Sequence, residues 1–519
     1  MALSSVDSTI RNSKSLCKKR DYLGAVSVLE RTLARFPNNK RIVNEIISIQ
    51  KKFASSQLEL PSVTLLNEVL TLLKSNDLEN SLSKTNELIQ TFPNSLDLYN
   101  IRGLIFLKSR MFLDAIHDFK TVVRIKNNDF QTYNNLGLAY KSTGDLVEAC
   151  KHFERAIKIN NKFYQAMNNL AICYKDQHKN SLAAKTFYEA LVINSDYFLA
   201  AKNLAKVYTG NLDQNSLLLL KKVITKAADE IKDTSSFKFL EANYERHMGN
   251  PEMAFNKYRE ANKLKFSQIQ NHFHKTRLLN QKRENELFKW IPEQSDTNSG
   301  SLKKVFILGA SRSGKSSLEK LLLKNPKVYS LYEAVQTKTS SPNMETNFDV
   351  GKGISFNDLF FASQEHLKNK GFEIVVSTNP KLIQVIPNIL KATKDCFFIF
   401  VNRELYSNAS EVFVKEYENG HYYSYDASAT IQEINAYNDL AAFFQEKSPE
   451  SSITVSFSDI VNLPEKTVSK VGKLIGTHFE IKNIPLFKYS VESEFANFFK
   501  SYLKNSRVYK EPQSHTISI

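Results

Sequence analysis

The first half of this 519-residue chain repeats itself every 34 residues, and this constrains its fold more than any other feature. The segment FQTYNNLGLAYKSTGD, from Phe130, is matched by YQAMNNLAICYKDQHK, from Tyr164. Each unit holds two stretches of helical periodicity, and Gly144-Asp145 supplies the turn between them in the first unit. One such unit cannot bury its own apolar face, so successive units must stack. The sequence therefore predicts an all-α superhelix.

Small and aromatic residues recur at matching positions of these units. We expect Gly137 and Ala149 to let paired helices approach closely, and Tyr140 and Phe153 to fill the space between one pair and the next. The pattern resembles the tetratricopeptide repeat family. Stacked repeats of this kind form a concave face that usually binds peptides or partner proteins, so the resemblance implies such a partner here.

The repeat phase also predicts how the chain is organised. We expect tetratricopeptide repeats, about seven with some degenerate, over residues 1–264, a helical connector and linker over 265–301, a second domain over 302–505 and a C-terminal tail over 506–519. Two aligned asparagine pairs, Asn134-Asn135 and Asn168-Asn169, leave two interpretations open. Their side chains either line the concave groove and bind a peptide backbone, or are solvated.

Composition restricts the class of protein. Charged residues make up 24% of the chain, and its apolar stretches are too short to span a membrane. The basic residues behind the formal charge of +16 are dispersed, which indicates solvated surface charge rather than a nucleic-acid site. The N-terminus has no apolar signal region, and the four cysteines form no C-x-x-C pair. We therefore expect a cytoplasmic protein without a metal site.

A second pattern begins at Gly309. The residues GASRSGKS, from Gly309 to Ser316, fit the phosphate-binding pattern G-x-x-x-x-G-K-[ST]. The apolar run Val305–Leu308 precedes them and is typical of a buried parallel strand, and an amphipathic helical pattern follows. Backbone amides at a helix N-terminus hold an anion, and Arg312 and Lys315 would add charge. We expect a three-layer α/β domain with a mainly parallel sheet.

The residues around this loop resemble the sulfotransferases, specifically those with tetratricopeptide repeats, which are related to tyrosylprotein sulfotransferases. The family's first signature, G-x-P-R-S-G-T-T-x-L-E, then H-P-x-V, then a glutamate, is matched without gaps at Gly309, Arg312, Ser313, Gly314, Leu318 and Glu319; Asn325-Pro326-Lys327-Val328 and Glu333 follow in register. The segment CFFIFVNRELYSNASEVFVKEYENGHYYSYD, from Cys396, is similar to the family's second signature.

This resemblance implies a donor and roles for individual residues. The donor would be 3′-phosphoadenosine 5′-phosphosulfate (PAPS), and no metal is implied. Glu333 would be the general base for the acceptor and Arg312 would stabilise the sulfuryl oxygens. The donor would be held by Ser311, Arg312, Ser313, Gly314, Lys315 and Ser316 at its 5′ end and by Arg403 and Ser410 at its 3′-phosphate.

Several positions depart from the family's pattern. The partner serine of Arg403 falls on Glu411, since 403 + 8 = 411, and Ser410 is one residue short of that position. A carboxylate there would repel a phosphate. A family lysine falls on Thr378, and a Tyr-Glu pair becomes Phe457-Ser458.

Three functions follow from these residues. The first is a PAPS-dependent sulfotransferase acting on a hydroxyl of a protein tyrosine or a glycan, with the repeats binding the acceptor or a partner. The second is a repeat scaffold with a catalytically degenerate domain. The third is a P-loop kinase or NTPase, suggested by Lys315-Ser316. Such an enzyme usually has an acid that closes a second strand and holds Mg²⁺, whereas here Asn402 closes the strand and Glu404 lies two residues beyond it.

Overall fold

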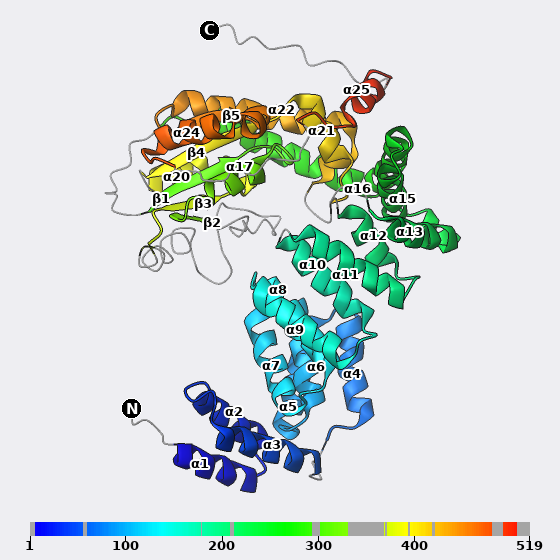
Figure 1. The fold of residues 1–519 in the computed structure, drawn as a ribbon, viewed down its shortest axis with the longest axis vertical. Coiled ribbons are helices and arrows are strands. Elements are labelled where there is room, and N and C mark those ends of the chain that lie inside the picture. Colours follow the sequence, from blue (N-terminus) through cyan, green and yellow to red (C-terminus); the bar gives the residue numbers. More distant parts are fainter. Residues whose placement is uncertain are drawn as a thin grey trace. The chain divides into compact units, whose positions relative to one another are not determined.

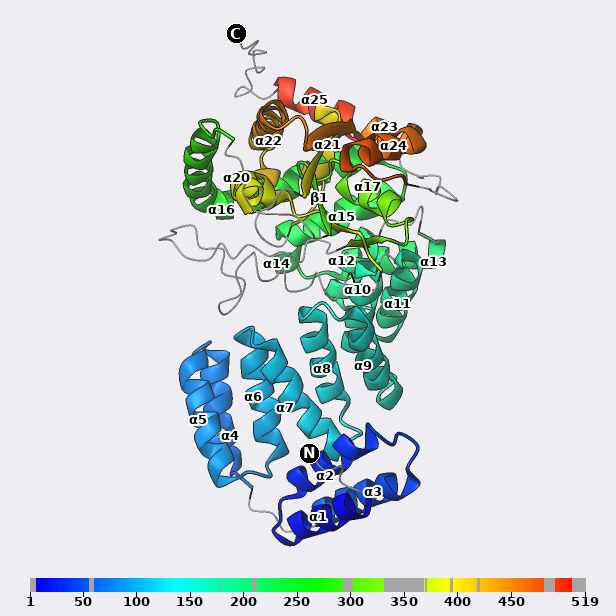
Figure 2. The same cartoon turned by 90° about the vertical axis from the view of Figure 1, so that its left-hand side faces the viewer.

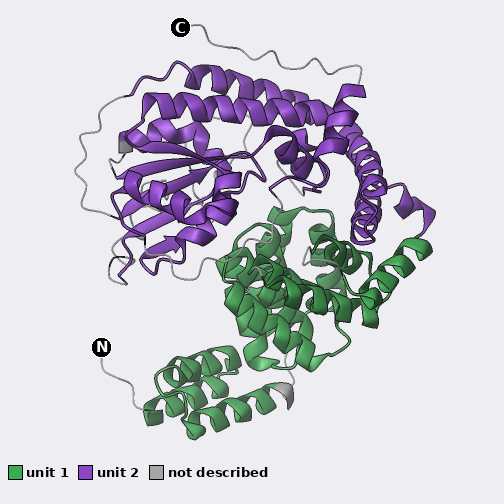
Figure 3. Ribbon diagram, turned by 45° about the horizontal axis from the view of Figure 1, so that its top comes forward, with its two compact units in different colours: residues 1–227 green, residues 228–519 purple. Residues whose placement is uncertain are grey.

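The computed structural model describes residues 6–55, 60–177, 179–207, 212–292, 302–330, 368, 371–392, 395–417, 421–479 and 491–505. The chain forms two compact units, residues 1–227 and residues 228–519 (Figure 3). Residues 293–301 of the predicted linker and the predicted tail over 506–519 lie outside the described residues. Helix α16 (Pro251–Leu287) runs without a break across residue 264, where the sequence predicted the repeats to end.

The first unit is built from paired helices, which confirms the predicted all-α repeat fold (Figure 1). Its helices are α1 (Val6–Lys18), α2 (Tyr22–Leu33), α3 (Lys40–Ser55), α4 (Val63–Lys74), α5 (Leu78–Thr91), α6 (Leu96–Lys108), α7 (Phe112–Ile125), α8 (Phe130–Ser142), α9 (Leu146–Ile159), α10 (Tyr164–Asp176), α11 (Asn180–Ile193), α12 (Phe198–Lys206) and α13 (Gln214–Lys226).

Close approach within a helix pair depends on the small residues of the repeat. A Cβ atom added at Gly137 in α8 would lie 2.7 Å from the ring of Phe153 in α9, which is fully buried. Only a glycine leaves room for that ring. The turn between the two helices ends at Asp145, whose carboxylate accepts a 3.1 Å hydrogen bond from the Glu148 N–H and caps α9.

The asparagines of the repeat join neighbouring units. The Asn169 amide donates a 2.9 Å hydrogen bond to the side-chain oxygen of Asn134, and Asn203 donates a 3.0 Å bond to Asn168 in the same way. Asn134 and Asn168 are 9% and 1% exposed. These two side chains therefore neither line a groove nor face solvent, the two alternatives that the sequence suggested, because each is enclosed between consecutive repeats. Asn135 is half-buried.

The second unit contains a five-stranded sheet in the order β2-β3-β1-β4-β5, and its four strand pairings are parallel. Its elements are α14 (Asp229–Lys232), α15 (Ser235–His247), α16, β1 (Lys303–Leu308), α17 (Lys315–Leu322), β2 (Val328–Ser330), β3 (Ile374–Ser377), η1 (Pro380–Val385), α20 (Ile386–Ala392), β4 (Cys396–Asn402), α21 (Leu405–Phe413), η2 (Tyr422–Tyr425), α22 (Ala427–Lys447), β5 (Ser452–Ser456), α23 (Phe457–Asn462), α24 (Pro464–Ile475) and α25 (Ala496–Asn505).

Helices cover both faces of the sheet. Along β1, Val305 and Ile307 pack with α17 and α24 on one face, whereas Phe306 and Leu308 pack with η1, α20 and α22 on the other. Figure 2 shows α17 and α24 on one side of β1 and α20 and α22 on the opposite side. Alternate side chains of a strand point to opposite faces, so a strand apolar on both needs two covering layers. The predicted three-layer α/β domain is confirmed.

A further apolar cluster joins α15 and α16 to the sheet domain. Phe239 and Phe255 of these helices pack with Phe413 of α21 and with Phe495 and Phe499, next to and within α25. The Asn262 side chain in α16 donates a 2.7 Å hydrogen bond to the Phe413 carbonyl oxygen. Because α21 follows β4, this packing carries α15 toward the carboxyl ends of β1 and β4.

Candidate functional site

The glycine-rich loop, Gly309 to Ser316, links the end of β1 to the start of α17. A Cβ atom at Gly309 would lie 2.4 Å from the carbonyl oxygen of Val401 in β4, so this close approach of two strands requires glycine. Gly314 caps α17 with φ of +110° and lies directly against the ring of Phe457. The loop therefore turns tightly at the carboxyl edge of the sheet, and the first N–H groups of α17 lack intrahelical partners.

Two polar side chains are enclosed by the loop. The buried Lys315 ammonium donates hydrogen bonds to the carbonyl oxygens of Gly309, at 2.8 Å, and Ala310, at 2.9 Å. Ser313 is 1% exposed, and among the described residues its hydroxyl has no hydrogen-bond partner. A buried hydroxyl without a partner is costly. A cation and a hydroxyl without a partner among the described residues, both inside one loop, are groups that can bind an oxyanion.

Tyrosine hydroxyls hold the loop from outside. The Ser311 hydroxyl lies 2.8 Å from the hydroxyl of Tyr417. The Gly309 N–H donates to the Tyr437 hydroxyl at 3.0 Å, and that hydroxyl donates to the Pro380 carbonyl oxygen at 3.1 Å. Burial raises the pKa of Tyr437 well above its usual value, so the group stays protonated and can donate.

A histidine lies beside this wall. The His421 ring is 4.3 Å from the Tyr417 ring, centroid to centroid, and its Nδ1 is 3.0 Å from the Tyr423 hydroxyl. Burial, reinforced by the charges of neighbouring lysines, lowers the pKa of His421 to about 4. The imidazole is therefore neutral at pH 7.

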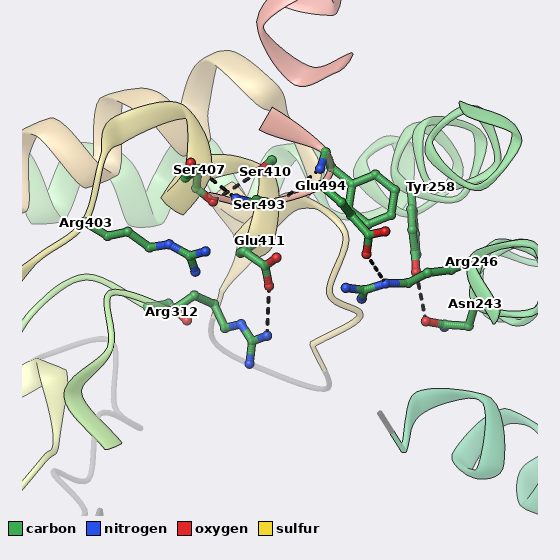
Figure 4. A network of polar contacts seen from close by, with 12 residues as sticks. Asn243, Arg246, Tyr258, Arg312, Arg403, Ser407, Ser410, Glu411, Ser493 and Glu494 are labelled. Carbon is green, nitrogen blue, oxygen red and sulfur yellow. Dashed lines mark hydrogen bonds and ion pairs between the residues drawn. The ribbon is translucent and has the colours of Figure 1, made fainter. Parts of the chain in front are cut away.

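Arginines gather around one carboxylate at the edge of the loop (Figure 4). Arg312, in the loop and with φ of +65°, donates a 2.9 Å hydrogen bond to Glu411 in α21. The Arg312 side chain is 46% exposed, whereas that of Glu411 is 11% exposed. Burial alone would raise the pKa of the Glu411 carboxyl, but three guanidinium groups together hold it below its usual value. They belong to Arg312, Arg246 and Arg403.

Arg403 follows β4 and lies near both the loop and the segment that precedes α25. Its guanidinium donates to the Val491 carbonyl oxygen, at 3.3 Å from Nε and 3.1 Å from Nη2. The same group lies 4.7 Å above the Phe457 ring, the ring that also contacts Gly314. Burial lowers the pKa of Arg403, while Glu411 acts to raise it. The structure thus places Arg403 near the glycine-rich loop through the shared Phe457 ring.

Other predicted site residues lie differently. Ser410 is fully buried, and its hydroxyl donates a 3.1 Å hydrogen bond to the Ser407 carbonyl oxygen. Successive helical residues point about 100° apart, so Glu411 rather than Ser410 faces the arginines. Ser316 is exposed at the start of α17. Glu333, predicted as the general base, lies outside the described residues.

Two contributors were not predicted from the sequence. Arg246, in α15, donates a 2.6 Å hydrogen bond to Glu494 and points its guanidinium toward Glu411 in Figure 4. Tyr437 reaches Gly309 from α22, 128 positions along the chain. No local pattern marks either residue, since both reach the site only through tertiary packing.

The acid nearest the end of β4, Glu404, has structural partners. It caps α21, accepting hydrogen bonds from the N–H groups of Tyr406, at 3.0 Å, and Ser407, at 2.6 Å.

Within the described ranges, no group of three or more His, Cys, Asp or Glu side chains is placed to hold a metal ion. Across those same ranges, we find no helix with both the length and the apolar character needed to span a membrane.

A cavity of about 640 Å³ opens on the β4–β5 side of the loop. Gly309, Asn402 and Tyr437 line it together with Gln445 and Thr454. It extends from the carboxyl end of β4 to the amino end of β5, where Pro449 and Ser452 also line it.

Comparison with known proteins finds one family model within each of the two units. Residues 304–480 match the model of the sulfotransferase family, and residues 130–163 match that of the tetratricopeptide repeat. A search of curated proteins found no match.

Solved structures are similar to part of the chain. Pseudomonas aeruginosa pilF is 13% identical over 38% of this chain and 87% of its own, with a TM-score of 0.32. PilW, titled a widely conserved type IV pilus biogenesis factor, is 17% identical over 40% and 92%, with a TM-score of 0.32. A tetratricopeptide repeat protein from Parabacteroides merdae is 14% identical over 50% and 93%, with a TM-score of 0.30.

Proposed function

Because residues 304–480 form a sulfotransferase-family domain and the chain carries a tetratricopeptide repeat, we propose that it is a sulfotransferase that moves a sulfuryl group from PAPS to a hydroxyl acceptor. The observation that carries this proposal is the glycine-rich loop at the N-terminus of α17, which encloses the Lys315 ammonium and the Ser313 hydroxyl. That hydroxyl has no hydrogen-bond partner in the part of the chain that the structure describes. These groups fit the 5′-phosphosulfate of the donor.

The donor would supply the sulfuryl group, and the chain's own residues would bind and orient it. In the transfer, the bond between sulfur and the bridging phosphate oxygen breaks, and a bond forms between sulfur and the acceptor oxygen. Arg312, Lys315 and the amides of α17 would stabilise charge on the sulfuryl and leaving oxygens. Glu333 would take the acceptor proton, and adenosine 3′,5′-bisphosphate would leave.

The acceptor and the compartment belong to the same proposal. A protein tyrosine or a glycan hydroxyl is the acceptor that the resemblance implies, and a cytoplasmic enzyme is what the scattered cysteines favour. The repeats would bind the acceptor or a partner protein, with the half-buried Asn135 available to a peptide backbone.

Two other functions compete with this one. The P-loop kinase or NTPase needs an acid near the end of β4 for Mg²⁺, and the engagement of Glu404 in capping α21 counts against it. Support for the scaffold with a degenerate domain comes from Glu411, which pairs with Arg312 of the loop.

A calorimetric titration distinguishes the three functions. We expect adenosine 3′,5′-bisphosphate to bind and Mg·ATP to bind weakly or not at all. Binding of Mg·ATP alone would assign the domain to the kinase class. Binding of neither, with peptide capture by the repeats, would favour the scaffold.

A further inference from the structure

One buried carboxylate already occupies the guanidinium cluster beside the glycine-rich loop. Glu411 binds Arg312 of the loop directly, and Arg403 and Arg246 point toward it from two other elements (Figure 4). Arg246 comes from α15, outside the residues that match the sulfotransferase family. The cluster therefore brings arginines from the glycine-rich loop, the end of β4 and helix α15 around a single acidic side chain.

The charges in this cluster are largely balanced from within the protein. Glu494 pairs with Arg246 at 2.6 Å, and the Val491 carbonyl oxygen accepts both hydrogen bonds described above from Arg403. Glu411 pairs with Arg312 at 2.9 Å. The three guanidinium groups thus face two carboxylates and a carbonyl oxygen. A ligand phosphate that entered the cluster would meet the Glu411 carboxylate at close range.

If the loop holds the 5′-phosphate of a nucleotide, the covalent structure of the nucleotide brings its 3′ substituent near the Glu411 carboxylate. The ribose is attached directly to the 5′-phosphate, so its 3′ substituent is one sugar away from an anion held by the loop. Arg312 belongs to that loop and is the residue that Glu411 binds. Dinucleotide sites distinguish a ribose hydroxyl from a ribose phosphate in a similar way. A carboxylate there accepts a hydrogen bond from the hydroxyl, whereas an arginine accommodates the phosphate.

We propose that Glu411 is an internal counter-anion that offsets the attraction of the arginines for a 3′-phosphate on the nucleotide, so that the site gains little affinity from that group. This inference rests on the proposed function and adds to it a determinant of donor selectivity. The free 3′-hydroxyl of an adenylyl donor can donate a hydrogen bond to Glu411, whereas a 3′-phosphate must displace this carboxylate from Arg312.

The test compares two nucleotides on the full-length protein. Dissociation constants for adenosine 5′-phosphate and adenosine 3′,5′-bisphosphate are measured by calorimetry on the wild type, Glu411→Ser and Glu411→Gln. We expect the wild type to bind the two nucleotides with dissociation constants within about threefold of each other. Both substitutions should tighten binding of the bisphosphate by about tenfold relative to adenosine 5′-phosphate, because they remove the competing charge.

A matched control removes one negative charge elsewhere. Glu373 pairs with Lys327, is about half exposed and lies just before β3, at the amino edge of the parallel sheet and therefore opposite the loop. Glu373→Gln should leave the ratio of the two dissociation constants unchanged. Thermal melting of each variant checks that it is folded.

The outcomes separate this inference from the proposed function. A wild type that prefers the bisphosphate by about tenfold or more, or a ratio that Glu411→Ser and Glu411→Gln leave unchanged, overturns the role of Glu411 while the donor site stands. Failure of both nucleotides to bind any folded variant overturns the proposed function and this inference together. If Glu411→Ser does not fold, the wild-type ratio and the nearly isosteric Glu411→Gln still decide.

Discussion

The backbone N–H of Gly309 donates a 3.0 Å hydrogen bond to the hydroxyl of Tyr437, which donates a 3.1 Å bond to the carbonyl oxygen of Pro380. One hydroxyl thereby joins the end of β1, helix α22 and the start of η1. We expect Tyr437→Phe to lower the free energy of unfolding by about 1–3 kcal/mol, because it leaves the Gly309 N–H without its acceptor. Denaturant unfolding measures this loss.

The same substitution should also weaken nucleotide binding, since the loop begins at Gly309. Tyr329→Phe is the control, because Tyr329 lies in β2 and is 37% exposed. If Tyr437→Phe behaves like Tyr329→Phe in both unfolding and calorimetric titration, the hydroxyl does not position the loop.

Arg312 and Glu333 are the residues on which catalysis is predicted to depend. Arg312→Ala removes a cation from the glycine-rich loop, and Glu333→Gln removes the predicted base. Each should lower the rate of sulfuryl transfer by about 10²–10³-fold, measured with labelled donor at saturating concentration. Lys320→Ala, later in α17, is the control for loss of a charge from this region. Unchanged transfer in both variants would refute the predicted site.

His421 should make the stability of the sheet domain sensitive to acid. Its folded pKa of about 4 lies below the ordinary value of 6.5, so between these two pH values the unfolded chain binds a proton that the folded chain does not. The free energy of unfolding should therefore fall as the pH drops from 6.5 toward 4, by at most about 3 kcal/mol from this group.

Replacing the imidazole tests this origin. In His421→Gln, the loss of stability between pH 6.5 and pH 4 should be smaller than in the wild type, measured by denaturant unfolding at each pH. His274→Gln, at an exposed position of α16, should follow the wild-type profile. Parallel profiles for wild type and His421→Gln would show that another group is responsible.

The parts of this protein that sequence could predict are those set by local spacing. The 34-residue repeat, the apolar run of β1 and the glycine-rich loop each follow from residues close together in the chain, and each is present in the structure. The mismatch at Glu411 was also visible in the sequence, as a carboxylate where a serine was expected.

What the sequence could not show is the environment of that carboxylate. Arg246 points toward Glu411 from α15, and Tyr437 contacts Gly309 of the loop from α22, so both come from helices distant in the chain. Ser410 precedes Glu411 by one residue in α21, and successive side chains of a helix point about 100° apart. The Ser410 side chain therefore points away from the arginines and bonds the Ser407 carbonyl oxygen. The burial of Asn134 and Asn168 likewise depends on the stacking of neighbouring repeats rather than on the repeat motif itself.

The asparagine contacts between repeats lead to the last prediction. Asn203→Ala removes the amide that donates to Asn168, and the side-chain oxygen of Asn168 would then lose this partner at a buried position. We expect the free energy of unfolding of the repeat unit to fall by about 1–3 kcal/mol. Denaturant unfolding followed by circular dichroism measures the change, with the exposed Asn127→Ala as control.

Asn135→Ala, at a half-buried position next to Asn134, should instead leave the free energy of unfolding within about 0.5 kcal/mol of the wild-type value and weaken partner binding. A stability loss in Asn135→Ala equal to that in Asn203→Ala would remove the distinction between a bridging and a groove-facing asparagine.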